Sequence, residues 1–185
     1  MPNYCENDLY VYGEPEKLKE FKEYAKGDYG LIDFNKFIPY PEKFKKQDDK
    51  ANRWRELKNK KDDELSDDEK KEKILLSMEA DERGYITDGY NSGGYEWCLK
   101  NWNTKWNACN VELNDNIEEG ILTYYFDTAW TPPLPVIKKM SEMFPELKFE
   151  LRYFECGAGF NGLFKCIGGK VIEDKMGDYF GDRGG

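Results

Sequence analysis

The chain has 185 residues, of which 39% are hydrophobic and 16% aromatic, and its formal net charge is −9. This negative charge argues against a broad phosphate-binding surface, because nucleic-acid affinity is built from clustered Lys and Arg. Histidine is absent, which excludes His-based catalytic triads and His-containing zinc sites.

The five cysteines form no C-x-x-C pair. They therefore lack the usual spacing of structural zinc, iron–sulfur clusters and disulfide frameworks, and we interpret them as buried reduced thiols. We expect no metal and no cofactor. No apolar run reaches the roughly 18–20 residues of a membrane span, and the first residues do not form a signal peptide. These features predict a cytoplasmic protein without a membrane partner.

The chain opens with a strand and a helix. Residues 7–12 alternate apolar and polar side chains, which predicts a strand. Apolar residues then recur at helical spacing between Pro15 and Gly27. Residues 31–38 alternate again and predict a second strand, which Pro39 closes.

The composition changes over residues 42–83, where acidic and basic residues are nearly equal in number. A capping box at Ser66 predicts that a second helix follows a first one. We interpret this stretch as a charged helical insertion, a hairpin, whose ordinary role would be a solvated cover. Phe44, Ala51, Trp54 and Leu57 could line one face of the first helix, and the second helix carries Ile74, Leu75 and Met78 as a thin apolar stripe.

The second half predicts the centre of the fold, with Trp106 and Trp130 as core residues. Beyond residue 175 we expect a flexible tail, residues 176–185. The predicted elements, in order, are a helix at 95–102, a hairpin of strands 108–113 and 121–127, a helix at 136–144, a strand at 147–153, and a hairpin of 163–167 and 170–173 across Gly168-Gly169.

Without the strand at 31–38 and the insertion, the order of elements is βαββαβ. This order predicts an α+β fold of the ferredoxin-like, split βαβ kind. It has an antiparallel sheet with helices on one face, a helical insertion and a C-terminal β-hairpin. We expect a single domain over residues 1–175.

Several blocks of sequence resemble the YubB-type ferredoxin-like domain family. They are MPNYCENDLYVYG, DFNKFIPYP, YEWCLKNWNTKWNA, YFDTAWTPP and LRYFECGAGFNG, and the match runs from Met1 to about Glu173. That family is carried by phages and plasmids and lacks an established biochemical activity. The resemblance implies the fold and a mobile-element setting in a bacterial host, and it supplies no catalytic residues.

Two constellations could carry chemistry. Asp127 and Glu155 are expected at strand ends in one sheet, where paired carboxylates can act as acid and base or hold a divalent metal. Hydrogen bonding at the sheet end is the alternative interpretation. The glycine-rich residues 157–162 resemble a phosphate loop, but a strand follows them and not a helix. We therefore interpret these glycines as permitting a bend.

Aromatic side chains form a third constellation. Tyr10, Tyr12, Tyr125 and Phe154 could share the sheet face away from the helices, which is how RNA-recognition domains stack bases. The basic half of that signature is weak, because the nearby Lys148 and Arg152 accompany Glu150. The alternative is that the insertion or the terminal hairpin covers this face.

These observations favour a non-enzymatic interaction protein of a phage or plasmid that binds a host or phage protein. Its sharpest form is an inhibitor of a host defence system. The contacts expected are Trp54, Leu57, Tyr10 and Tyr12. Two alternatives stay open: a single-stranded nucleic-acid-binding module, which the net charge disfavours, and a metal-dependent enzyme at Asp127 and Glu155. The sequence does not indicate the oligomeric state.

Overall fold

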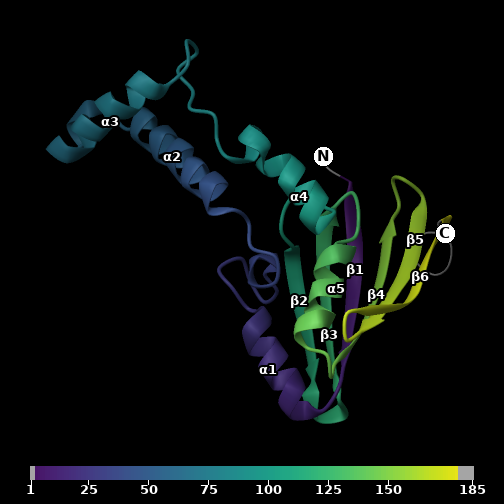
Figure 1. The fold of residues 1–185 in the computed structure, drawn as a ribbon. Coiled ribbons are helices and arrows are strands. Elements are labelled where there is room, and N and C mark those ends of the chain that lie inside the picture. Colours follow the sequence, from purple (N-terminus) through teal and green to yellow (C-terminus); the bar gives the residue numbers. More distant parts are fainter. Residues whose placement is uncertain (1–2, 179–185) are drawn as a thin grey trace. The chain divides into compact units, whose positions relative to one another are not determined.

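A computed structural model describes residues 3–178, which form one six-stranded antiparallel sheet and five α-helices (Figure 1). None of these helices is long and apolar enough to cross a membrane. The strands are β1 Tyr4–Tyr12, β2 Cys109–Asn116, β3 Ile121–Ala129, β4 Lys148–Glu155, β5 Phe160–Ile167 and β6 Lys170–Asp178. The helices are α1 Pro15–Ala25, α2 Glu42–Asn59, α3 Asp67–Glu79, α4 Tyr95–Trp102 and α5 Leu134–Met143.

The chain divides into two units. The first comprises Met1–Pro39 together with Cys98–Gly185, and the second is Tyr40–Trp97. The predicted insertion, residues 42–83, lies inside the second unit, which begins slightly earlier and continues to Trp97. Each unit is described by itself below.

The sheet of the first unit has the order β2-β3-β1-β4-β5-β6. Strand β1 pairs antiparallel with β3 on one side and with β4 on the other. Each β–α–β unit is therefore split by a strand of the other one, which is the ferredoxin-like arrangement predicted from the order of elements. The terminal hairpin β5–β6 adds to the edge of β4 and so extends the sheet.

The core of the first unit lies between the sheet and helices α1 and α5. Phe21 of α1 makes edge-to-face contacts with Tyr124, Phe149 and Phe144, at centroid distances of 6.1, 5.4 and 5.2 Å. From β1, Leu9 and Val11 are fully buried on the same face of the sheet. Alternation along the strands places the residues between them on the opposite face.

The predicted strand at residues 31–38 is wrong. The segment contains a short 3₁₀ helix, Phe34–Lys36. The Asp33 carboxylate accepts hydrogen bonds from the backbone N–H of Asn35 at 2.9 Å and from the Asn107 amide at 2.6 Å. Ile32 and Phe34 are fully buried, as their alternation suggested. Local side-chain bonds, and not a sheet ladder, hold their backbone.

The C-terminal strand is longer than predicted. Strand β6 runs to Asp178, so residues 176–178 belong to the sheet and not to a tail. The remainder of the predicted tail, residues 179–185, lies outside the described residues.

The second unit has a small core of its own. Trp54 and Leu57 of α2 pack with Leu65 and Leu76, and with the partly buried Ala80 and Ile86. The predicted buried face of α2 and the capping box at Ser66 are confirmed. On α3, Leu76 faces the core, whereas the apolar stripe of Ile74, Leu75 and Met78 is exposed.

This division leads to a prediction about folding. Replacing residues 41–93 by a short Gly/Ser linker should leave the first unit folded, because its core residues lie outside that segment. Circular dichroism and a cooperative urea transition would measure the outcome. Loss of the cooperative transition would show that the folding of the first unit depends on the second. A variant with a linker of twice the length is the control, because it tests whether a linker that is too short causes the loss.

Candidate functional site

The sheet face opposite α1 and α5 carries Tyr10, Tyr12 and Tyr125, and we name it the tyrosine face. Residue pairing places Tyr10 opposite Glu150 and Tyr12 opposite Lys148, so these side chains share one face. Tyr125 and Phe154 lie on the same face, as their alternation predicted. The rings of Tyr10 and Tyr12 are stacked with 6.4 Å between centroids.

Two cations cover these rings. The Arg152 guanidinium lies 5.2 Å from the centroid of the Tyr10 ring, and the Lys148 ammonium lies 5.2 Å from that of Tyr12. A cation over an aromatic face is attracted by the ring quadrupole. The basic residues that the sequence placed beside Glu150 are therefore held against the tyrosines.

A row of ion pairs continues across β5 and β6. Glu150 is buried and accepts hydrogen bonds from Arg152 at 2.8 and 3.0 Å, and its second oxygen lies 3.4 Å from Lys165. Lys165 also contacts Glu173 at 3.2 Å, and Glu173 contacts Lys175. Burial alone would raise the pKa of Glu150, but its bonds to Arg152 and Lys165 outweigh burial and lower that pKa.

The tyrosine face is hollowed where β1, β4, β5 and β6 meet. The hollow has a volume of about 730 Å³, and its lining includes Tyr10, Arg152, Phe154, Leu163 and Lys175. Aromatic rings, an apolar floor and cations at the rim thus lie together in one concave surface.

Sequence reasoning found the aromatic part of this surface and missed Lys165 and Lys175. The alternation of Lys165 with the buried Phe164 and Cys166 was a signal that it faces away from the helices. The register that places Lys165 opposite Glu150, and Lys175 opposite Leu163 in line with Arg152, could not be read from the chain.

The buried carboxylate gives a prediction about stability. Glu150→Gln should lower the free energy of unfolding at pH 7 by about 1–3 kcal/mol, because two charged hydrogen bonds lose their acceptor charge. The pKa of Glu150 is lowered in the folded chain, so its contribution is present above the unfolded pKa and is lost as the pH falls through the folded value. The difference in unfolding free energy between the variant and the wild type should therefore become smaller below about pH 4.

Urea unfolding between pH 3 and pH 8 measures this difference. Glu118→Gln is the control, because Glu118 is exposed and its ion pair to Lys19 is long, at 3.4 Å. A difference for Glu150→Gln that stays constant over the whole pH range would contradict the electrostatic origin.

The two carboxylates expected to form a polar site lie on opposite faces of the sheet. Glu6 pairs with both Asp127 and Phe154, which places Asp127 on the tyrosine face and the next residue of β4, Glu155, on the other. Asp127 accepts a hydrogen bond from the Asn110 amide at 2.8 Å. The structure therefore does not bring Asp127 and Glu155 into one acid–base or metal site.

Glu155 instead holds the glycine-rich loop before β5. Its carboxylate accepts hydrogen bonds from the backbone N–H groups of Gly157, at 2.8 Å, and Ala158. Gly159 has a φ of 71°, which supports the interpretation of these glycines as permitting a bend. Within residues 3–178, no three Cys, Asp or Glu side chains gather closely enough to hold a metal ion.

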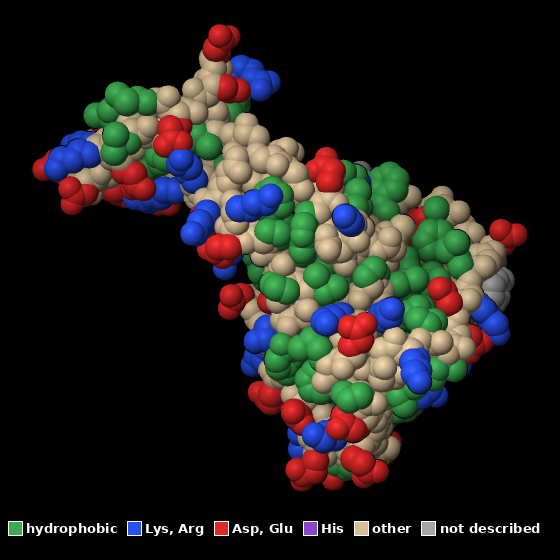
Figure 2. All heavy atoms as spheres, viewed as in Figure 1, with side chains coloured by type: hydrophobic (Ala, Val, Ile, Leu, Met, Phe, Trp, Pro, Cys, Tyr) green, Lys and Arg blue, Asp and Glu red, His purple; other side chains and the backbone are tan. Residues whose placement is uncertain are grey.

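The expected partner contacts Trp54 and Leu57 are buried in the second unit's core. Trp54 also donates from its indole N–H to the carbonyl of Gly84 at 3.1 Å. Neither side chain is available as a surface contact, because both pack against Leu65 and Leu76 in the core of the α2–α3 hairpin. The exposed aliphatic side chains Ile74, Leu75 and Met78 of this unit lie instead on α3, where hydrophobic side chains are visible in Figure 2.

The predicted core positions of Trp106 and Trp130 are also wrong. Trp106 is only partly buried, and Trp130 is 50% exposed with a φ of 72°. Lys105 lies 4.3 Å from the centroid of the Trp130 ring. Positive φ turns the Trp130 side chain out of the strand it follows, so the large ring does not enter the core.

The surrounding backbone is held by the two sequence blocks that contain these tryptophans. The Thr104 hydroxyl exchanges hydrogen bonds with the N–H and carbonyl of Ala129, at 3.0 and 3.1 Å. The Asn103 amide donates to the carbonyl of Pro132 at 2.9 Å. These contacts join the NWNTKW block to the TAWTPP block.

The tryptophans differ in their expected contribution to stability. Trp102 is buried, contacts Phe34 edge-to-face at 5.9 Å and donates to the carbonyl of Ile38 at 2.8 Å. Trp102→Ala should cost about 3–5 kcal/mol of unfolding free energy, and Trp130→Ala about 1 kcal/mol or less. Urea titration of both variants measures this, and equal losses would contradict the exposed position of Trp130.

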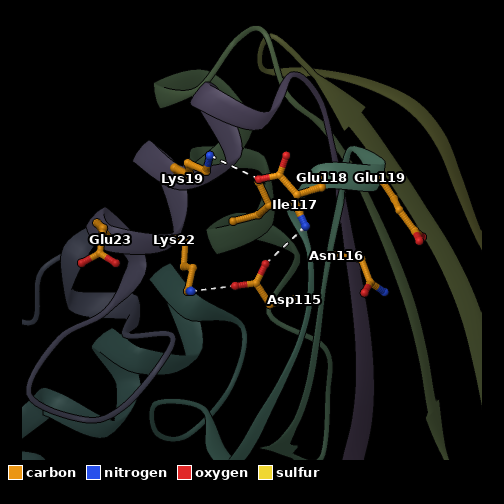
Figure 3. Close-up of a pocket in the computed structure, with 8 residues that line it drawn as sticks. All are labelled: Lys19, Lys22, Glu23, Asp115, Asn116, Ile117, Glu118 and Glu119. Atoms are coloured by element: carbon orange, nitrogen blue, oxygen red, sulfur yellow. Dashed lines mark hydrogen bonds and ion pairs between the residues drawn. The ribbon is translucent and has the colours of Figure 1, made fainter.

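A second hollow, of about 480 Å³, lies beside α1 at the β2–β3 turn (Figure 3). Its cations are paired, Lys22 with Asp115 at 2.7 Å and Lys19 with Glu118 at 3.4 Å. Asp115 also accepts from the backbone N–H of Ile117 at 3.3 Å. Exposed pairs of this kind contribute little free energy, and we interpret this hollow as the solvated end of the sheet.

The cysteines are free thiols. Burial raises the pKa of Cys5 to about 12 and also raises that of Cys166, so neither is a thiolate near neutral pH. Cys156 is exposed, in contrast to the expectation that all five are buried.

The fold and the chain path define an α+β protein with a ferredoxin-like domain. Residues 101–183 match the family model described as the ferredoxin-like domain in Api92-like protein. The C-terminal part of this chain is thus similar to that domain. A comparison with curated proteins found no match.

A solved structure is similar over nearly the full length. It is the crystal structure of a protein api92 from Yersinia pseudotuberculosis, which matches with a TM-score of 0.59 and 10% sequence identity. The match covers 98% of this chain and 99% of that one. At this identity the likeness shows the fold alone. Neither match names the YubB-type family or a phage or plasmid.

Proposed function

We propose that this protein is a non-enzymatic interaction protein that binds another protein through the exposed apolar side of α3. The observation that carries the proposal is the exposure of Ile74, Leu75 and Met78, whose exposed fractions are 58, 64 and 77%. Met78 is four positions after Ile74 and three after Leu75, so it neighbours both on the helix surface. We name these three side chains the α3 patch.

Leaving the α3 patch in water is unfavourable, because burying each such side chain would contribute roughly 1.5–3 kcal/mol. Exposed apolar patches with polar rims are typical of protein-binding surfaces. Charged residues surround this one, among them Lys70, Lys71 and Glu79. A protein partner with an apolar groove and mixed charges at its rim fits this chemistry.

Helix α3 is held in place by contacts within the second unit. Arg53 of α2 contacts Glu72 at 2.8 Å and Glu69 at 3.5 Å, and Lys60 contacts Glu69 at 3.0 Å. The Ser66 hydroxyl accepts from the N–H of Glu69 at 3.2 Å and fixes the helix start. Because the helix is already ordered, binding would cost little further conformational entropy.

The setting of this interaction rests on the resemblance to the YubB-type family. We place the protein in the cytoplasm of a bacterial host, encoded by a phage or plasmid, with a host or phage protein as its partner. An inhibitor of a host defence system is the form that this setting favours. The absence of histidine and the separation of Asp127 from Glu155 support binding over catalysis.

Substitution of the α3 patch tests the proposal. The triple variant Ile74→Gln, Leu75→Gln and Met78→Gln should lose a partner that the wild type retains, with affinity reduced at least tenfold, because hot-spot losses commonly exceed about 1.4 kcal/mol. Gln keeps the helix, since it is a good helix former. Quantitative mass spectrometry of proteins retained from cells that carry the gene, followed by calorimetry with the purified partner, provides the measurement.

The matched control is Tyr29→Gln with Ile172→Gln, which changes exposed apolar side chains in the first unit. This control should bind the partner as the wild type does. Equal retention of the partner by the triple variant would refute the α3 patch as the contact. Deletion of the gene should reduce phage or plasmid propagation in hosts with defence systems, and unchanged propagation would refute the anti-defence part.

A further inference from the structure

The tyrosine face combines two features that proteins use on single-stranded nucleic acid. Aromatic rings stack with unpaired bases, and a row of cations follows the backbone phosphates. Tyr10 and Tyr12 are neighbours on one strand, with nearly parallel rings at 16°. We propose that this face binds single-stranded nucleic acid, a function separate from that of the α3 patch.

Arg152 and Lys175 extend further into solvent than the carboxylates that pair with them. The side chains of Arg152 and Lys175 are 60 and 74% exposed, whereas that of Glu150 is only 6% exposed. The buried Glu150 and the partly buried Glu173 thus lie deeper than the heads of Arg152 and Lys175 and orient them through ion pairs. Because the carboxylates lie deeper than these cations, the surface presents the positive charge of Arg152 and Lys175 to a ligand, although the chain as a whole is negatively charged.

Arg152 has a particular place in this arrangement. Its guanidinium covers the Tyr10 ring and donates two hydrogen bonds to Glu150. A guanidinium is planar and stacks on bases as well as binding phosphates. Arg152 therefore extends the stacking surface of Tyr10 toward the hollow, where Phe154 and Leu163 provide apolar walls.

The same features favour a single strand over a duplex. Bases in a duplex are stacked on one another and do not present their faces to a sheet.

The number of cations on this face sets the expected salt dependence. Only a few phosphates would be contacted by Lys148, Arg152, Lys165 and Lys175. With two to three contacts, the logarithm of the affinity should fall with the logarithm of salt with a slope of about −1.5 to −2.

Fluorescence anisotropy with the full chain tests the proposal. The probes are labelled 12-nucleotide dT and rU strands at low salt, with a 12-base-pair duplex for comparison. Binding in the micromolar range is expected for the single strands and weaker binding for the duplex. Tyr10→Leu with Tyr12→Leu should reduce the affinity at least tenfold, because each stacked base contributes substantially.

Lys175→Glu is a second variant, on an exposed side chain whose replacement leaves the core intact. It should weaken binding, and the logarithm of the affinity should depend less steeply on the logarithm of salt, by the amount that one phosphate contact contributes. Tyr29→Leu, which changes an exposed tyrosine in the loop after α1, should bind as the wild type does. Melting curves establish that each variant is folded.

Absence of binding by the wild type at 100 µM protein, roughly a hundred times a micromolar Kd, would overturn the proposal. Equal binding by the Tyr10/Tyr12 double variant would overturn it as well. If the wild type binds no oligonucleotide and the folded Tyr10/Tyr12 double variant loses a protein partner, the tyrosine face binds protein instead. The triple Gln variant of the α3 patch should keep its nucleic-acid affinity, so the two proposals fail independently.

Discussion

Strand β1 is hydrogen-bonded along both edges, to β3 over its whole length and to β4 from Glu6 to Tyr12. A shift of one residue in this pairing would exchange the buried Leu9 and Val11 for Tyr10 and Tyr12. Each fully buried aliphatic side chain contributes roughly 1.5–3 kcal/mol, so such a shift is strongly unfavourable. The positions of the tyrosines on the opposite face thus depend on the apolar side chains beneath them.

The sequence predicted those parts of the fold whose signals are local. Alternation placed β1 and β4, proline and capping residues placed the helix starts, and the pair Gly168-Gly169 placed the last hairpin. The segment at residues 31–38 alternates in the same way and is not a strand, because the side chains of Asp33 and Asn107 bind its backbone. That competition depends on a residue more than seventy positions away.

Helix α3 shows a different limit. Its residues Ile74, Leu75, Leu76 and Met78 point in several directions around the helix, so spacing alone does not decide which side is buried. Contact with Trp54 and Leu57 selects Leu76. For the tyrosine face, period-two alternation was sufficient to group the aromatics, whereas the contribution of Lys165 and Lys175 required the pairing of β4, β5 and β6.

Trp130 places a bulky residue where the backbone is left-handed, at a φ of 72°. That conformation costs a side chain of this kind about 1–3 kcal/mol, and glycine adopts it without steric conflict. Natural variation at position 130 would therefore separate two selective pressures. Relatives selected only for folding would drift toward glycine there, and relatives in which the exposed ring makes a contact would retain an aromatic residue.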